Sequence, residues 1–213
     1  MKKLKAHTFF SEDENERIRQ AVGQAETDTS GEIATMVVDY SDSYREAEIL
    51  GALSLSGLLG LILALAIHHV TIWSYIPLVI LFFIPARYLF RRFPHLKLPF
   101  VGKRRVLEAV RERAVRAFFE KGLYKTRDET GILIFISILE RKVWILGDKG
   151  IDAKIAPQFW RSLADELSAG LRQNRACEAL CTVIEKCGKT LKEHFPRRGD
   201  DVNELEDELI DES

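Results

Sequence analysis

The chain contains one long segment without charge between two strongly charged parts. Asp, Glu, Lys and Arg are all absent from Ile49 to Ala86, although charged residues make up 30% of the 213 residues. Within this segment, two apolar runs extend over about 49–67 and 70–90. A helix crosses the core of a bilayer with roughly 20 residues, so each run is long enough to span. The pattern therefore predicts a transmembrane helical hairpin over 45–92, with a tight linker at 68–71.

Small residues recur every four positions in the first run, at Ala52, Ser56, Gly60 and Ala64. In an α-helix this spacing lines one face, and a face of small residues lets helices approach closely in lipid. We expect this face to pack against the second run. The alternative is a buried helical pair in the core of a soluble protein, which the length of the runs disfavours.

Basic residues crowd the side of the hairpin that lies away from the linker. They are Arg87, Arg91, Arg92, Lys97, Lys103, Arg104 and Arg105, with no acidic residue before Glu108. The positive-inside rule places this side in the cytoplasm, which predicts a two-span protein of a bacterial inner membrane with both termini cytoplasmic. The three cysteines, an odd number, fit a reducing compartment. In the linker, His68 and His69 are candidates for a metal ligand or a pH response, although a linker needs neither.

The charge balance indicates which partners to expect. A net charge of −1 gives the molecule no general attraction to nucleic acid. Beside a span, the basic cluster is better explained by topology and by contact with anionic membrane lipids. The tail at 197–213 is acidic, with eight acidic residues and no basic ones from Gly199 onward. Its Val202, Leu205, Leu209 and Ile210 follow helical spacing, so we expect a short helix that binds a partner.

The segments 1–44 and 101–196 carry the patterns of one split domain, with a basic linker at 93–100 after the hairpin. Before the hairpin, the capping box at 11–14 opens a helix, and 32–39 is rich in β-forming residues. After the hairpin, the patterns predict a helix over 107–118, strands over 132–139 and 143–146, and two further helices. The two long strands are joined by a long crossover, so we expect them to pair in parallel, with the third strand antiparallel. The expected fold is α/β: a small three-layer α/β/α sandwich with a mixed sheet and the transmembrane hairpin inserted after the first strand.

Short motifs centred on glycine border the predicted strands. They are Thr29-Ser30-Gly31-Glu32-Ile33, Arg127-Asp128-Glu129-Thr130-Gly131-Ile132, Glu140-Arg141-Lys142-Val143 and Gly147-Asp148-Lys149-Gly150-Ile151. In this order they resemble the TPM domain family, over residues 10–40 and 104–190. That family includes thylakoid-lumen proteins of photosystem II repair and many bacterial membrane-anchored proteins.

The resemblance implies an α/β sandwich but no single activity. Some members are described as acid phosphatases, some as metal-binding proteins, and others as accessory proteins of membrane complexes. Members usually have an N-terminal export signal, a C-terminal anchor and a domain outside the cytoplasm. Here the predicted anchor is internal, and the charge bias places the domain inside.

The predicted strands gather carboxylates at one end of the sheet. Residues 130–131 are expected opposite 147–148, and a parallel first strand brings Glu32 to the same end. Glu32, Asp128, Glu129 and Asp148 are therefore candidate ligands for calcium or magnesium, which prefer oxygen. A metal there could bind phosphate. Turn chemistry is the alternative, because acidic residues beside glycine commonly hydrogen-bond the local backbone.

Other candidates lie elsewhere in the sequence. Asp39, Ser41, Asp42 and Glu140 fall at the opposite end of the sheet, where α/β proteins usually bind ligands. Cys177 and Cys181 with His194 are a weaker candidate for zinc. The sequence lacks the spacing of a Ser-His-Asp triad, a Cys-based phosphatase loop, a Walker loop and a dinucleotide fingerprint. The leading hypothesis is therefore a binding or accessory module in membrane-protein maintenance, with a membrane-protein partner. The alternative is a metal-dependent acid phosphatase.

Overall fold

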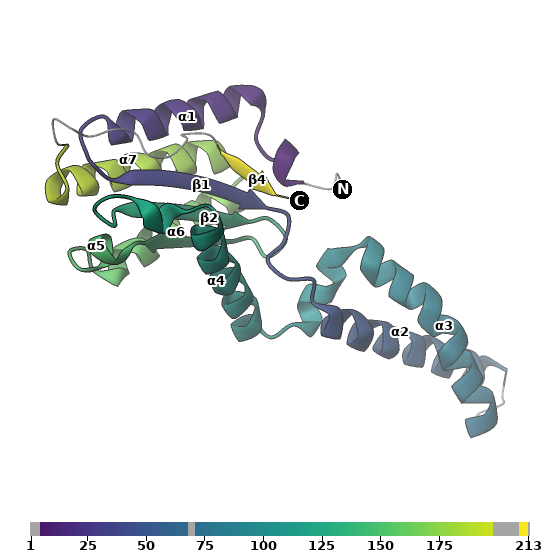
Figure 1. Ribbon diagram of the computed structural model, residues 1–213. Helices are drawn as coiled ribbons and strands as arrows, with labels where there is room; N and C mark the ends of the chain where they lie inside the picture. The colour runs from purple at the N-terminus through teal and green to yellow at the C-terminus, as the bar shows by residue number, and fades with distance from the viewer. Residues whose placement is uncertain (1–4, 68–70, 198–208, 213) are drawn as a thin grey trace. The chain divides into compact units, whose positions relative to one another are not determined.

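The computed structural model describes residues 5–67, 71–197 and 209–212. The chain divides into two compact units, one formed by residues 1–41 and 107–213 and the other by residues 42–106. We call the first the α/β unit and the second the helical unit (Figure 1).

The α/β unit is built on a four-stranded sheet with the strand order β3-β2-β1-β4. Its strands are β1 (Glu32–Val38), β2 (Gly131–Ser137), β3 (Lys142–Gly147) and β4 (Ile210–Glu212). β1 pairs in parallel with β2, starting with Glu32 opposite Gly131, and β3 pairs antiparallel to β2. Both pairings confirm the predictions from the sequence.

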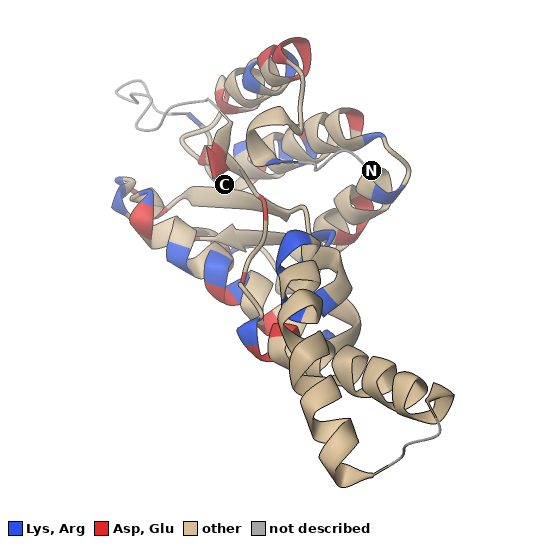
Figure 2. Cartoon of the chain, turned by 90° about the vertical axis from the view of Figure 1, so that its right-hand side faces the viewer, with Lys and Arg blue, Asp and Glu red and all other residues tan. Residues whose placement is uncertain are grey.

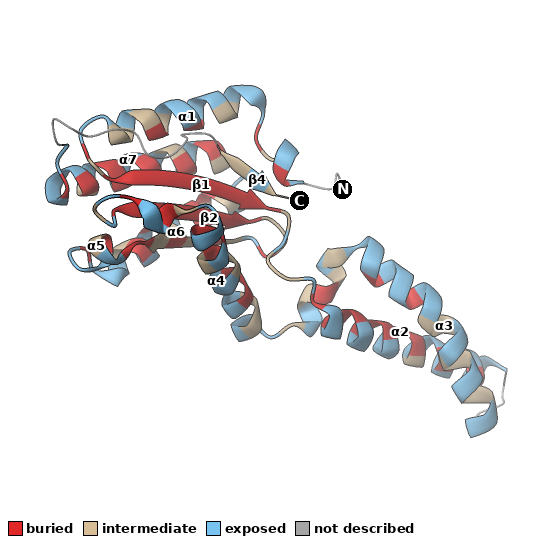
Figure 3. Ribbon diagram, viewed as in Figure 1, coloured by how far each residue is buried: buried red, intermediate tan, exposed pale blue. Residues whose placement is uncertain are grey.

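Helices cover both faces of this sheet, which confirms the three-layer sandwich (Figure 1). One face carries α1 (Glu12–Glu26), α6 (Pro157–Arg172) and α7 (Ala176–His194), and the other carries α4 (Lys103–Glu120). In β1, Ile33 and Val37 join the core on the first face, whereas Met36 and Val38 join the core on the second. Every residue of β1 and β2 is buried, as expected of strands that are covered on both sides (Figure 3).

Short elements complete the α/β unit: η1 (Ala6–Thr8), η3 (Leu123–Lys125) and α5 (Lys149–Asp152). The predicted capping box is present at the start of α1. The Glu14 backbone N–H donates to Ser11 Oγ at 3.2 Å, and the Ser11 N–H donates to the Glu14 carboxylate at 2.9 Å. Two N–H groups that a helix start leaves unpaired are thereby satisfied.

The end of the acidic tail forms a strand, so the predicted helix is wrong for Leu209 and Ile210. Val202 and Leu205, the other two residues of that prediction, lie outside the described residues. β4 pairs in parallel with the end of β1, and the Asp39 N–H donates to the Glu212 carbonyl at 3.1 Å. An edge strand exposes a row of unpaired backbone groups, and pairing with this edge outweighs the local helical pattern.

The helical unit contains α2 (Arg45–Ala66), α3 (Ile72–Arg92) and η2 (Pro94–Phe100). By length and composition, α2 and α3 can cross a membrane, with mean hydropathies of 2.3 and 1.6. Their charged residues stand at the start of α2 and the end of α3, and the rest of both helices is uncharged (Figure 2). His68 and His69 lie outside the described residues.

The face of small residues in α2 packs against α3, as predicted. Ala52, Ser56, Gly60 and Ala64 are all buried. A Cβ on Gly60 would lie 3.2 Å from Val79 Cγ2 of α3, so little more than glycine fits there. The remaining surface is apolar and points outward, with the residues Leu58, Ile62, Leu65, Ile80 and Ile84 more than half exposed. A hairpin that is apolar on the outside suits lipid rather than water.

Candidate functional site

The glycine-centred motifs meet at the end of the sheet where β1 and β2 begin. We call residues 30–32, 128–131 and 147–150 together the motif edge. The Glu32 N–H donates to the Thr130 carbonyl at 3.2 Å, and Thr130 Oγ1 donates to the Ser30 carbonyl at 2.9 Å. On the other side, the Asp148 N–H donates to the Gly131 carbonyl at 2.9 Å. The three segments are therefore neighbours, as the expected strand register implies.

The motif glycines allow main chain to pack directly on main chain. A Cβ on Gly150 would lie 2.6 Å from the Asp128 carbonyl oxygen, and one on Gly131 would lie 2.5 Å from the Leu123 carbonyl oxygen. The Gly150 N–H donates to the Glu129 carbonyl at 3.1 Å, and Glu129 itself has a left-handed backbone with φ of 54°. The glycines of these motifs thus serve close backbone approach.

The four carboxylates predicted to bind calcium or magnesium differ in their surroundings. Glu32 and Asp148 are buried, Asp128 is half-buried and Glu129 is exposed. Asp148 is the N-cap of α5, and its Oδ1 accepts a hydrogen bond from the Lys149 N–H at 2.8 Å. Across the described ranges, no three or more His, Cys, Asp or Glu side chains are grouped so that they could hold a metal ion. The motif edge brings the four residues to one end of the sheet, but their side chains do not form such a group.

Asp148 uses only one of its two carboxylate oxygens in a hydrogen bond. Asp148 Oδ2 is buried and makes no hydrogen bond. Asp152, four residues later and at the other end of α5, has its pKa raised by burial and by repulsion from Asp148. Asp152 was not among the site residues predicted from the sequence, although its spacing of four from Asp148 could have indicated it.

The carboxylates of the second candidate site make hydrogen bonds and an ion pair within the protein. Glu140 is buried and accepts from the Ser41 N–H at 3.0 Å and from Ser137 Oγ at 2.5 Å. Asp39 accepts from the Ala6 N–H at 2.6 Å. Asp42 belongs to the helical unit, where it pairs with Arg105 at 2.5 Å.

Of the cysteines of α7, Cys177 and Cys187 are buried and Cys181 is half-buried. Cys177 Sγ lies 3.9 Å from the Glu14 carbonyl, and Cys181 Sγ lies 4.0 Å from the Arg17 carbonyl. Burial raises the pKa of Cys177 to about 11 and that of Cys187 to about 12. At neutral pH these two sulfurs are therefore thiols rather than the thiolates that bind zinc.

The fold and the motif edge define an α/β domain that is split in sequence by a candidate membrane hairpin. More particularly, the family model of the TPM domain matches residues 104–190. The chain therefore contains a TPM domain in its second part, which confirms the resemblance seen in the motifs. No curated protein matches the sequence.

Among solved structures, the chain is similar to the NMR structure of the BA42 protein from the psychrophilic bacterium Bizionia argentinensis sp. nov.. The TM-score is 0.60 at 20% sequence identity, and the match covers 95% of this chain and 94% of that chain. At this level of identity the likeness shows the fold alone.

Proposed function

We propose that the protein is a two-span protein of a bacterial inner membrane, and that its α/β unit is a binding or accessory module in the cytoplasm. On this proposal it acts with a membrane-protein partner, in the maintenance of membrane proteins. The observation that carries the proposal is the chemistry of the motif edge. Its most distinctive residues make contacts between backbones, and Asp148 caps a helix. Contacts between backbones can shape a binding surface, whereas catalysis would require a set of reactive side chains.

The pairing of β1 with β2 supports the topology. These strands lie on either side of the hairpin in sequence and are neighbours in one sheet. Both flanks of the hairpin must therefore lie on the same side of a membrane, which two spans provide. The basic residues at the end of α3 favour the cytoplasmic side.

Two experiments test this proposal. Reporter domains are fused to the C-terminus and, separately, into the linker at 68–71. We expect a cytoplasmic signal from the first and a periplasmic signal from the second, and the reverse result would overturn the orientation. Cross-linking of the full chain in its membrane, followed by mass spectrometry, should recover a membrane protein attached to the α/β unit. Cross-links confined to the chain itself would count against an accessory role.

A metal-dependent phosphatase is the second candidate, favoured by the buried Asp148 oxygen that makes no hydrogen bond. A hard cation such as calcium or magnesium is a natural ligand for such an oxygen. The test is hydrolysis of a phosphomonoester by the full protein with calcium, with magnesium and with a chelator. The phosphatase function would replace the accessory role if turnover needs the metal and is lost in Asp148→Asn. The control Asp165→Asn, at an exposed site, should keep that turnover.

A further inference from the structure

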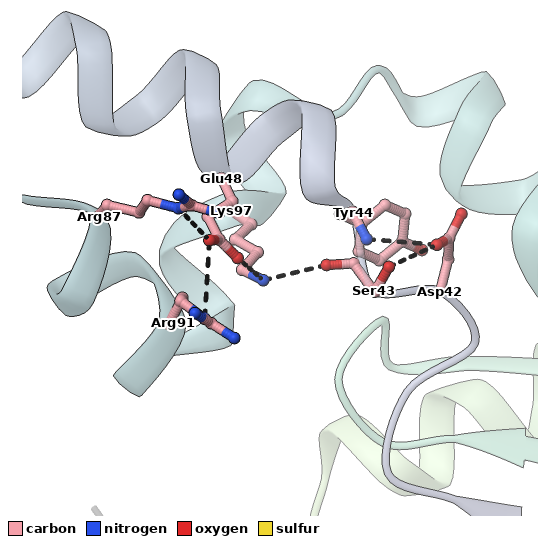
Figure 4. A network of polar contacts seen from close by, with 7 residues as sticks. All are labelled: Asp42, Ser43, Tyr44, Glu48, Arg87, Arg91 and Lys97. Carbon is pink, nitrogen blue, oxygen red and sulfur yellow. Dashed lines mark hydrogen bonds and ion pairs between the residues drawn. The ribbon is translucent and has the colours of Figure 1, made fainter. Parts of the chain in front are cut away.

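One carboxylate near the charged end of the hairpin collects three basic side chains. Glu48 of α2 accepts from Lys97 Nζ at 3.0 Å and from Arg87 Nε at 3.2 Å, and Arg91 Nε lies 3.8 Å away (Figure 4). Glu48 and Lys97 are only 6% and 8% exposed. Three positive charges around one negative charge leave this cluster positive, and its buried members fix the place of the others.

The ammonium group of Lys97 is buried and bonded within the protein, whereas the side chains of the two arginines are largely open to solvent. Its ammonium group also donates to the Ser43 carbonyl at 3.0 Å and is enclosed. The side chains of Arg87 and Arg91 are 49% and 68% exposed. Arg87 donates to Glu48 from Nε, whereas Arg91 approaches Glu48 at 3.8 Å without a hydrogen bond. Within the described part of the chain, neither arginine makes another side-chain hydrogen bond.

The spacing of the arginines makes them a pair. They are four residues apart on α3, so they lie on one face of the helix, one turn from each other. A guanidinium presents two N–H groups in a fixed fork that matches the oxygens of a phosphate. Glu48 holds Arg87 through a hydrogen bond and Arg91 through a longer ion pair, so both forks are oriented before a ligand arrives, which lowers the entropy cost of binding.

The surface around this pair is apolar and lies at the end of a predicted span. Ile84 and Tyr88 of α3 are 72% and 71% exposed, and Phe93 and Phe100 are 40% and 38% exposed. In a membrane, aromatic rings gather at the level of the headgroups, with aliphatic side chains deeper. A ligand that joins a phosphate to hydrocarbon chains fits both kinds of surface at once.

We propose that Arg87 and Arg91 bind the phosphate of an anionic phospholipid, and that Glu48 and Lys97 are positioning residues which hold the two guanidinium groups in place. This inference rests on the membrane location in the proposed function. The acyl chains lie along the exposed apolar face of α3. The site is separate from the motif edge, since all its residues belong to the helical unit.

The test measures lipid binding to the full protein in detergent by native mass spectrometry, with phosphatidylglycerol and phosphatidylcholine as probes. We expect phosphatidylglycerol to bind in preference. The double variant Arg87→Lys with Arg91→Lys keeps both charges but loses both forks. Loss of one charge-assisted hydrogen bond corresponds to roughly tenfold weaker binding, so a loss of at least about tenfold is expected. Arg92→Lys, next in sequence but on another part of the helix, is the matched control and should bind as the wild type does.

Glu48→Gln separates positioning from general charge attraction. The substitution makes the cluster more positive, so a purely electrostatic surface would bind phosphatidylglycerol more tightly. If Glu48 orients the arginines, binding becomes weaker instead. Equal binding by the double lysine variant and the wild type would overturn the proposal, whether or not Glu48→Gln folds.

Inorganic phosphate is the competing probe. The lipid proposal predicts that millimolar phosphate leaves bound phosphatidylglycerol in place, and complete displacement would show a site for free phosphate. Binding in detergent does not depend on orientation in the membrane. A reversed reporter result would therefore overturn the cytoplasmic location of the module and leave the lipid site standing. Loss of lipid selectivity would overturn the lipid site and leave the cytoplasmic module standing.

Discussion

Gly150 lies so close to Asp128 that a Cβ at position 150 would be 2.6 Å from the Asp128 carbonyl oxygen. The main chain at Gly150 thus packs directly on the main chain at Asp128, in a motif segment that is distant in sequence. Neither side can move away by changing a rotamer. The glycine is therefore needed for the packing of α5 against the turn before β2.

Gly150→Ala should lower the free energy of unfolding by about 1–3 kcal/mol, as expected for overpacking in a rigid site. The better helix propensity of alanine offsets at most about 1 kcal/mol of this cost. Denaturant unfolding of the α/β unit, followed by intrinsic fluorescence, measures the change. Lys149→Ala, which shortens an exposed side chain on the same helix, is the control and should be nearly neutral. A stable Gly150→Ala would mean that α5 is free to shift.

The short strand β4 should contribute to the stability of the sheet. Ile210 lies opposite Met36 of β1 and packs against the core on the α4 side. Ile210→Asp should lower the free energy of unfolding by roughly 1–3 kcal/mol, because it removes apolar contact and leaves the edge of β1 open. Asp211→Asn changes an exposed neighbour and should have little effect. An open edge also invites strand pairing between molecules, so Ile210→Asp should increase self-association in analytical ultracentrifugation. No change in either measurement would show that β4 adds nothing to the sheet.

The close contact between Gly51 and Phe90 should control packing of the hairpin. A Cβ at position 51 would lie 2.2 Å from Phe90 Cε1 in a buried ring. Gly51→Leu should therefore separate α2 from α3 at that level, at a cost of about 1–3 kcal/mol. Thermal unfolding in detergent and protease sensitivity of residues 42–106 report the effect. Leu58→Ile, on the exposed face of α2, should leave both unchanged.

Asp152 should give the α/β unit a pH dependence of known sign. Its folded pKa is raised by burial and by Asp148, so between the unfolded value and the raised value the folded state binds more protons. Stability therefore falls as pH rises through that window, and the penalty is complete at neutral pH. Asp152→Asn should be more stable than the wild type at pH 7, and the difference should vanish below the ordinary pKa of aspartate. Asp165→Asn controls for the loss of one charge. A destabilised Asp152→Asn at pH 7 would show instead that the carboxylate has a favourable partner.

The sequence predicted those features that depend on local pattern. The capping box at Ser11 and the period of four in α2 each follow from one segment, and each is confirmed. The parallel pairing of β1 with β2 followed from the length of the crossover.

The features that the sequence did not predict depend on contacts between distant residues. Glu48 meets Arg87 and Lys97 across the hairpin, and no local pattern specifies that one carboxylate will collect both. Ile210 fits a helical pattern, but the open edge of β1 draws it into a strand. At the motif edge, neighbours could be inferred from strand register, whereas the direction of each carboxylate depends on χ angles that pairing does not fix.

The division of the sheet by the hairpin has a consequence for biogenesis. A ribosome synthesises β1 first, then both candidate spans, and only afterwards β2 and β3, which supply one side of the sheet around β1. On the proposed membrane location, β1, which is buried in the folded chain, has no partner strand until the hairpin has been synthesised. On that proposal, insertion of the hairpin precedes closure of the α/β unit, and a chain whose hairpin failed to insert would leave β1 as an unpaired apolar strand.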